Sequence, residues 1–310
     1  MTFSAGRLKG DSLLLLAAII WGFAFVAQRS GMAVIGPFAY SAARSTLGTL
    51  SLIPLLIFSK RRSARTGTAP GGLSTGKKVV WATLAGLVLF AAANLQQMGL
   101  VSTTAGNAGF ITGLYVILVP IMGIFAGRVS GPRIWAGASL AVVGLYILSV
   151  GSGFKMAPGD ILELVGAFFW AGHILVINRL VTRMEALEIA VGQFTACSVF
   201  SLIAALVFEP SPFAGLIPAA LPILYGGPLS IGVAYTLQVV AQKTVHPAHA
   251  SIIMSMEALF AGIGGVLLLH EPLTLRLVAG GLLMLAGMIV SQLERRAKPG
   301  VAVVEGQPAG

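Results

Sequence analysis

Two charged residues lie deep inside long apolar stretches of this sequence, and they are the first candidates for chemistry. Glu257 lies near the middle of the stretch 246–269, and Arg44 lies inside the stretch 36–58, about two helical turns from one end. If such stretches cross a membrane, each charge costs about 2.5 kcal/mol or more at the bilayer centre. Burial favours the neutral form of a carboxyl group without a nearby cation, so Glu257 could exchange a proton or bind the cationic group of a ligand. The alternatives are a buried structural bond of Glu257, an Arg44–Glu257 pair, and an Arg44 side chain that extends to the membrane surface.

Further polar and aromatic side chains lie among Phe, Ile, Leu and Val in the same kind of stretch. A polar group that faces lipid costs several kcal/mol, so it must either bond to another helix or face water in a cavity. The cavity interpretation predicts a substrate site, whose nine candidate residues are Trp21, Asn94, Asn107, Thr112, Tyr115, Trp170, His173, Tyr235 and Glu257. In the other interpretation, Asn107 and Thr112 form hydrogen bonds between helices and His173 is a buried neutral ring. The two tryptophans are then bulky packing residues.

The elements that position these residues are apolar helices long enough to cross a membrane. The chain has 310 residues, a mean hydropathy of +0.92 and 10% charged residues, whereas a soluble protein carries about 25%. Ten apolar stretches can each span a hydrocarbon core of about 30 Å as a helix. They are 12–32, 36–58, 79–98, 105–126, 133–151, 160–180, 186–208, 214–235, 246–269 and 275–293. The sequence therefore predicts an all-α polytopic membrane protein with ten transmembrane helices.

The distribution of positive charge predicts how the chain lies in the membrane. With both termini in the cytoplasm, most of the 20 Lys and Arg residues fall on cytoplasmic ends and loops, as the positive-inside rule requires. The net charge of +10 thus orients the chain in a cell membrane and does not indicate a nucleic-acid partner. We interpret 12–32 as a retained first helix rather than a signal peptide, because its apolar run is long and no A-x-A site closes it. The single cysteine, Cys197, allows no intrachain disulfide.

The two halves of the chain resemble each other. The pair Asp11 and Trp21 has the same spacing as the pair Asp160 and Trp170. In the fifth and tenth stretches the matching residues are Arg133, Gly137 and Gly144 in one and Arg276, Gly280 and Gly287 in the other. The sequence therefore predicts a five-helix unit written twice, over 11–151 and 160–293, followed by a flexible cytoplasmic tail at 294–310. Five is odd, so the second unit enters the membrane from the opposite side, an inverted repeat that recurs in secondary transporters.

Glycines and prolines predict where these helices pack closely and where they break. Gly109, Gly113, Gly123 and Gly127 are expected to give the fourth helix a smooth face that packs tightly on a neighbour. The run "YGGPLS" at 225–230 could unwind the eighth helix midway and free carbonyl groups to line a cavity, or it could only kink the helix.

Three segments resemble the EamA-like branch of the drug/metabolite transporter superfamily. They are "AIIWGFAFV" in the first helix, "TTAGNAGFITGLYVILVPI" in the fourth, and "MEALFAGIGGVLLLHEPLTLRLVAGGLLMLAGMIV" across the last two. The resemblance covers about residues 11–293. It implies ten helices in two inverted repeats, and a central cavity formed largely by helices 1, 3, 4, 6, 8 and 9. It also implies transport, mostly export, of amino acids or similar small metabolites. The family often has a Glu-Pro pair in the ninth helix, where this chain has Glu257 and Ala258.

Together these observations predict a secondary transporter, an exporter of small polar metabolites such as amino acids that works by alternating access. The alternative is a passive facilitator or channel for small solutes. An enzyme is not expected, because the sequence has no H-E-x-x-H, no paired intramembrane aspartates and no nucleotide-binding G-x-x-x-x-G-K-[ST]. No cofactor or metal is expected either, since no acidic or thiol partner is evident for His246 and His249. The expected partners are a small-molecule substrate, the lipid bilayer and a coupled proton.

Overall fold

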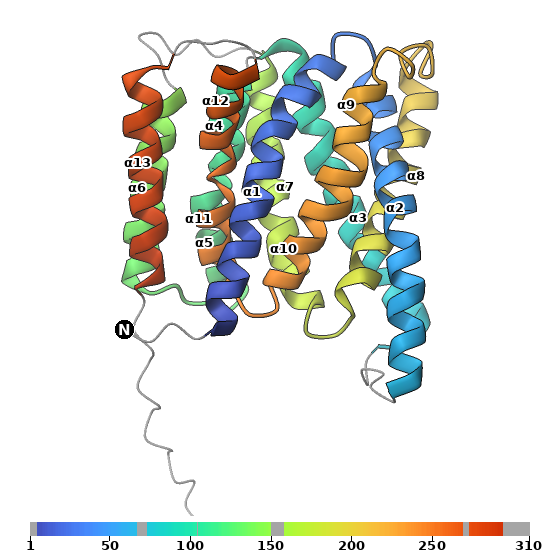
Figure 1. The fold of residues 1–310 in the computed structure, drawn as a ribbon, viewed down its shortest axis with the longest axis horizontal. Helices are drawn as coiled ribbons and strands as arrows, with labels where there is room; N and C mark the ends of the chain where they lie inside the picture. The colour runs from blue at the N-terminus through green and yellow to red at the C-terminus, as the bar shows by residue number, and fades with distance from the viewer. Residues whose placement is uncertain (1–4, 67–72, 104, 150–157, 269–272, 294–310) are drawn as a thin grey trace, which may run out of the picture.

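The computed structural model describes residues 5–66, 73–103, 105–149, 158–268 and 273–293, and all of its regular elements in these ranges are helices. The chain runs up and down as a bundle (Figure 1). The helices are α1 (Ala5–Gly31), α2 (Pro37–Thr66), α3 (Thr75–Ser102), α4 (Ala105–Gly113), α5 (Tyr115–Phe125), α6 (Pro132–Ser149), α7 (Pro158–Leu180), α8 (Ala186–Phe208), α9 (Ala220–Leu224), the π-helix η1 (Tyr225–Tyr235), α10 (Thr236–Ala241), α11 (Pro247–Met254), α12 (Glu257–Leu268) and α13 (Leu275–Gln292). The predicted tail at 294–310 lies outside the described residues.

The described chain has eight candidate membrane spans and two shorter apolar helices, which confirms the predicted all-α polytopic fold with ten apolar segments. Eight are long and apolar enough to span a bilayer, and the apolar helices within α6 and α13 are shorter. Three of the ten are assembled from more than one helix: α4 with α5, α9 with η1 and α10, and α11 with α12.

The predicted bounds of the eighth segment, 214–235, were wrong. The segment begins at Ala220 and ends at Ala241, and residues before it form turns. Pro212, Gly215 and Pro218 explain the late start, because each disfavours a helix interior despite the apolar residues between them. At the other end, the segment continues beyond 235 through α10 (Thr236–Ala241), which contains Gln238.

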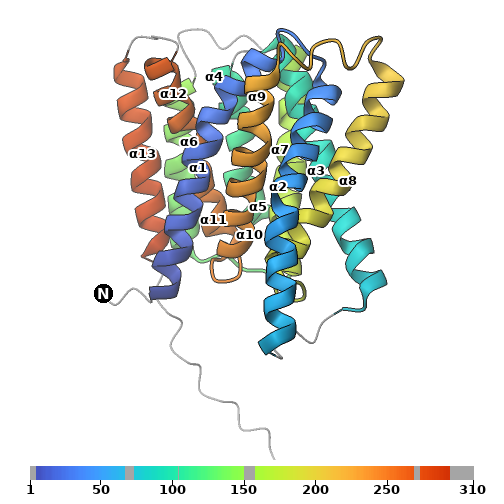
Figure 2. The same cartoon turned by 45° about the vertical axis from the view of Figure 1, so that its right-hand side comes forward.

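The helices pack in pairs that join the two halves of the chain. α6 lies beside α13 at one edge of the bundle, and α2 lies beside α8 towards the other (Figures 1 and 2). In the centre, α1 packs on α12 and η1, while α7 packs on α3, α4 and α5. These contacts match one another if α1 corresponds to α7, α3 to η1, and the fourth segment to the ninth. The inverted repeat requires such matching, and it remains a prediction.

Close glycine packing occurs at the α6–α13 contact rather than on the fourth segment. A Cβ atom on Gly137 would lie 2.6 Å from the carbonyl oxygen of Gly287, so the two backbones touch. One on Gly144 would lie 2.7 Å from the carbonyl oxygen of Gly280. We call these four residues the glycine seam.

The prediction that the four glycines of the fourth segment together form a smooth, tightly packed face was wrong. A Cβ atom on Gly109 would have its nearest neighbour at 3.9 Å, and one on Gly123 at 3.8 Å, which are ordinary contacts. Only Gly113 is crowded, by Leu145 at 3.0 Å. Gly127 has a positive φ of 73° two residues after the end of α5, a conformation that suits glycine at a helix C-terminus.

Two helical segments break at mid-membrane positions. The fourth breaks at Leu114 between α4 and α5, and the ninth breaks at Ser255 and Met256 between α11 and α12. The ninth breaks without the proline that the family often has. The hydroxyl of Ser255 donates to the carbonyl oxygen of Ile252 at 2.8 Å, a local bond that competes with the helix ladder. The eighth segment contains the π-helix η1, so it does not unwind but is locally wider.

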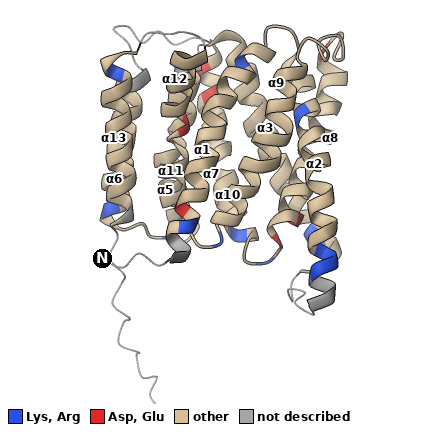
Figure 3. Cartoon of the chain, viewed as in Figure 1, with Lys and Arg blue, Asp and Glu red and all other residues tan. Residues whose placement is uncertain are grey.

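Positive charge gathers at the end of the bundle where α1 begins, which we call the basic end (Figure 3). The described Lys and Arg residues there are Lys9, Lys60, Arg61, Arg62, Lys77, Lys78, Arg128, Arg133, Arg179, Arg183 and Lys243. Arg29 and Arg276 lie towards the other end, which we call the opposite end, and Arg44 lies inside the bundle. The positive-inside rule therefore predicts that the basic end faces the cytoplasm.

The first prediction concerns the glycine seam. Gly137→Ala should lower the midpoint of thermal unfolding in detergent, because overpacking two touching backbones costs about 1–3 kcal/mol. Gly109→Ala is the matched control and should be neutral or stabilising by about 0.5–1 kcal/mol, since its Cβ meets only ordinary contacts. Equal unfolding midpoints for the two variants would show that the seam is not a close contact.

The second prediction concerns orientation. Thr182 lies in the exposed turn between α7 and α8 at the basic end, and Ser211 lies in the exposed turn after α8 at the opposite end. In a Cys197→Ala background, an impermeant thiol reagent added to intact cells should label a cysteine at Ser211 and not one at Thr182. The reverse labelling pattern would overturn the orientation.

Candidate functional site

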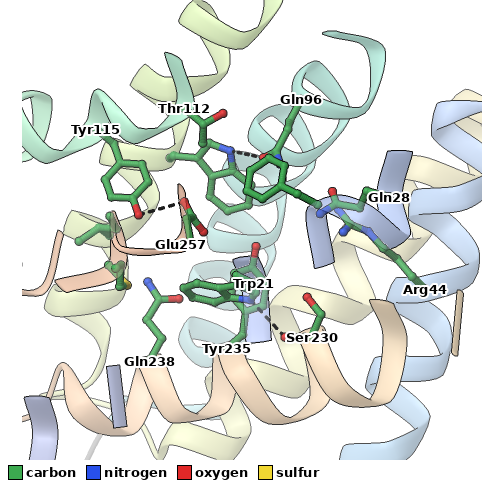
Figure 4. A pocket seen from close by; sticks show the side chains of 14 residues that line it. Trp21, Gln28, Arg44, Gln96, Thr112, Tyr115, Ser230, Tyr235, Gln238 and Glu257 are labelled. Atoms are coloured by element: carbon green, nitrogen blue, oxygen red, sulfur yellow. Dashed lines mark hydrogen bonds between the residues drawn. The ribbon is translucent and has the colours of Figure 1, made fainter. Parts of the chain in front are cut away.

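A pocket lies in the centre of the bundle, where the broken helices meet (Figure 4). Its lining side chains are Trp21, Phe25 and Gln28 from α1, Arg44 from α2, Gln96 from α3, Thr112 from α4, Tyr115 from α5, Trp170 and Ile174 from α7, Ser230 and Tyr235 from η1, Gln238 from α10, Met254 from α11 and Glu257 from α12. Residues from both halves of the chain thus line the pocket, which lies among the central helices of the bundle.

Most of the sequence-predicted site residues come together in this pocket. The six that line it are Trp21, Thr112, Tyr115, Trp170, Tyr235 and Glu257. Asn94 and His173 do not line it. The side-chain nitrogen of Asn94 donates to Ser201 at 3.0 Å, and His173 bonds to Gln193 at 2.9 Å, so each joins two helices. The side chain of Asn107 lies outside the described part of the structure.

Three aromatic rings form one wall of the pocket. Tyr235 lies against Trp21, with ring centroids 4.6 Å apart, and it stacks on Trp170 at 6.2 Å. Phe194 closes on the far side of Tyr235 in an edge-to-face contact at 5.1 Å. Because each half of the chain contributes one tryptophan to the same tyrosine, this wall joins the halves directly at the site.

The polar ends of the two tryptophans are both bonded, which fixes their rings. The indole nitrogen of Trp170 donates to the side-chain oxygen of Gln96 at 2.9 Å. The indole nitrogen of Trp21 donates to the backbone carbonyl of Ser230 at 3.4 Å, inside the π-helix. Both rings can therefore present apolar faces to a ligand while their N–H groups remain satisfied.

Glu257 is placed by the break in the ninth segment. It is the first residue of α12, so its carboxyl group lies at the positive end of that helix's dipole. It is 7% exposed and accepts a hydrogen bond of 3.1 Å from the hydroxyl of Tyr115. Tyr115 in turn begins α5 directly after the break in the fourth segment. The two breaks thus bring an acid and a phenol together at the pocket.

Arg44 is the positive counterpart in the same pocket. It is 5% exposed, and its guanidinium carbon lies 5.4 Å from the ring centre of Tyr40. Its Nε atom is buried with no hydrogen-bond partner among the described residues. The ion pairs of the described residues do not include one between Arg44 and Glu257, and Figure 4 shows the two side chains on opposite sides of the pocket. Arg44 therefore neither extends to the surface nor pairs with Glu257.

Several lining residues were not among the nine predicted ones. Gln96 lies near the end of α3, yet it is buried and lines the pocket. Phe25, Ile174 and Met254 are apolar, so polarity gave no signal for them. Ser230 belongs to "YGGPLS", and the contribution of this run is a carbonyl group from a locally widened helix.

Polar side chains also bond to one another in the basic half of the bundle. A carboxylate oxygen of Asp11 lies 3.1 Å from Nε2 of His249, whose Nδ1 lies 2.8 Å from the hydroxyl of Ser291. Sequence reasoning found no acidic partner for His249, and this was wrong, because Asp11 comes from the other end of the chain. A second bond joins the side chain of Asn178 to the carbonyl of Gln242 at 3.4 Å.

Comparison with known proteins supports the transporter interpretation. The EamA-like transporter family model matches residues 8–150 and again 157–292. An uncharacterized transporter of Archaeoglobus fulgidus is 32% identical over 93% of this chain and 87% of its own length. The threonine/homoserine exporter RhtA of Escherichia coli K12 is 27% identical over 89% of this chain and 88% of its own.

A solved crystal structure has the same fold. It superposes with a TM-score of 0.72 at 21% identity, covering 94% of this chain and 97% of that one. With two family matches that together cover most of the chain, a relative above 30% identity, and a multi-helix bundle around a central pocket, the chain belongs to the EamA-like transporter family of the drug/metabolite transporter superfamily.

Proposed function

We propose that this transporter exports small zwitterionic amino acids by alternating access, and that Arg44 and Glu257 hold the two charged ends of the substrate. The observation that carries the proposal is that one arginine and one carboxyl group line the same pocket without pairing with each other. The relative named a threonine/homoserine exporter supports the substrate class and the direction.

The charges suit a zwitterion because each lacks a full protein partner. Glu257 accepts one hydrogen bond from Tyr115, which leaves carboxylate capacity for a substrate ammonium group. Arg44 offers a guanidinium fork that binds carboxylates in a planar, two-point geometry. An amino acid bound between them would replace both hydration shells with charged hydrogen bonds.

The rest of the pocket suits a small side chain of mixed character. The wall of Trp21, Tyr235 and Trp170 offers apolar faces, while Thr112 and Gln238 offer polar groups. Neutral amino acids with short or hydroxyl-bearing side chains match this lining. A few placed polar groups in a largely apolar pocket are the usual means of orienting such ligands.

The third prediction tests the two charges with L-threonine as the probe. In proteoliposomes, wild-type protein should catalyse counterflow of labelled L-threonine. Arg44→Gln and Glu257→Gln should each weaken its binding by about 1.5–3 kcal/mol, the contribution of a charged hydrogen bond. This corresponds to roughly a tenfold to hundredfold rise in the half-saturating concentration. Arg276→Gln and Glu188→Gln, which change charged residues outside the pocket lining, are the controls.

Analogues of threonine separate the two roles. The corresponding amino alcohol lacks the carboxylate, and the corresponding hydroxy acid lacks the ammonium group. Wild-type counterflow should be inhibited by the amino acid far better than by either analogue. Arg44→Gln should bind the amino alcohol as well as the amino acid, and Glu257→Gln should do the same for the hydroxy acid. Unchanged selectivity in both variants would contradict the zwitterion site, and uptake without counterflow would identify a channel.

A further inference from the structure

A second buried carboxyl group lies directly behind the pocket wall. Glu163 of α7 is 0% exposed and does not line the pocket. Its Oε2 atom accepts a hydrogen bond of 3.0 Å from the hydroxyl of Thr112, which does line the pocket. Its Oε1 atom is buried without a hydrogen-bond partner among the described residues. A buried carboxyl oxygen without a hydrogen-bond partner costs free energy of folding unless a proton or another ligand is bound to it.

The space around Glu163 admits a proton and not a metal ion. A Cβ atom added to Gly99 would lie 2.7 Å from Oε1, so the backbone of α3 already occupies the space beside this atom. A hard cation such as Ca²⁺ or Mg²⁺ needs about six or more oxygen ligands around it. A proton needs only the lone pair of Oε1, which would then carry an O–H group.

Thr112 can make the hydrogen bonds available in the pocket depend on whether Glu163 is protonated. A threonine hydroxyl has one hydrogen and two lone pairs. When Glu163 is ionised, Thr112 donates its hydrogen to the carboxylate and presents only lone pairs to the pocket. When Glu163 is protonated at Oε1 and its carboxyl group then rotates by half a turn, the O–H group faces the Thr112 oxygen and donates to it, and the hydrogen of Thr112 is free to turn into the pocket. Protonation thus reverses the hydrogen bond that Thr112 offers a ligand.

We propose that Glu163 is a proton-binding site of this transporter and that Thr112 couples its protonation to substrate binding. The inference deepens the proposed export function and rests on it for the coupling, but not for the proton binding. In each cycle, one proton would bind Oε1 from the opposite end and leave towards the basic end, against the movement of one substrate. No bond other than the O–H bond forms or breaks.

The position of Glu163 gives the proton a short route. Glu163 lies five residues after Pro158, the first residue of α7, which is about 8 Å along the helix axis from the opposite end. Asp160 lies between them on the same helix, also buried, and accepts a hydrogen bond from the hydroxyl of Thr103. The site therefore lies between the opposite end and the pocket.

Few other titratable or charged groups of the described residues lie near Glu163. The elements packed on α7 include α3, α4, α5 and α11. Together with α7 itself and the end of α1, their described titratable or charged side chains are Arg29, Lys77, Lys78, Tyr115, Asp160, His173, Arg179 and His249. Arg29 is turned to the carbonyl oxygens of Leu100 and Thr103, His173 bonds to Gln193, and Tyr115 bonds to Glu257. Lys77, Lys78, Arg179 and His249 lie in the basic half of the bundle.

The fourth prediction is tested first without any substrate. Infrared difference spectra of the purified protein between high and low pH should show a protonated-carboxyl band that Glu163→Gln removes. Glu188→Gln, which changes a partly exposed residue at the basic end, should leave this band in place. Thr112→Val should keep the band but shift its frequency, since the hydrogen bond is lost. An identical spectrum for Glu163→Gln and wild type would overturn the proposal, because Glu163 would then not change its protonation state between the two pH values.

A second measurement tests the coupling. At fixed pH, addition of L-threonine should change the Glu163 band in wild type and not in Thr112→Val. In proteoliposomes, a pH gradient should drive accumulation of labelled L-threonine with wild type, and Glu163→Gln should lose this drive completely. Accumulation by Glu163→Gln at the wild-type level would overturn the coupling. If no amino acid is moved by wild type, the proposed function fails, while the infrared band still decides whether Glu163 binds a proton.

Discussion

The structure depends on one constraint: lipid offers no hydrogen bonds, so every polar side chain inside the membrane needs a partner within the protein or a cavity. Apolar surface alone does not hold such helices together, because lipid is equally apolar. The polar groups therefore join helices in pairs, such as Asn94 with Ser201 and His173 with Gln193. Arg44, whose buried Nε has no partner among the described residues, lines the central pocket. The pocket thus contains a polar group that the described bundle leaves unsatisfied.

The breaks in the fourth and ninth segments are what bring these groups to the centre. An unbroken helix satisfies its own backbone, whereas a break exposes helix ends with free N–H and C=O groups and a local dipole. Tyr115 and Glu257 each begin a helix after a break, and they bond to each other. Thr112 lies on the other side of the first break and bonds to Glu163. Both carboxyl groups therefore contact the same interrupted segment. A movement of α4 relative to α5 would change the hydrogen-bonding surroundings of both groups.

Much of the fold was predictable from the sequence, because hydropathy alone determines which stretches can lie in lipid. The pocket was only partly predictable. Trp21, Trp170 and Glu257 stood out as polar or bulky residues in apolar helices, but the same signal selected Asn94 and His173, which bond to neighbouring helices instead. Sequence position cannot say which face of a helix meets the cavity. Glu163 was missed because it lies near the start of an apolar stretch and close to Asp160, where acids usually mark a helix end. The glycines of the fourth segment led to a wrong prediction of close helix packing for a related reason. Their spacing along the sequence does not reveal whether a second backbone is near.

The glycine seam between α6 and α13 lies at the edge of the bundle, and neither helix supplies a side chain to the described lining of the pocket. This close contact between two backbones is therefore separate from the central pocket. Residues of the pocket wall, such as Phe25 or Met254, can be exchanged during evolution without loosening the contact on which α6 and α13 depend. The same separation gives protein engineers a practical rule. A library that varies the pocket and leaves the seam untouched should yield folded proteins with altered pockets at high frequency.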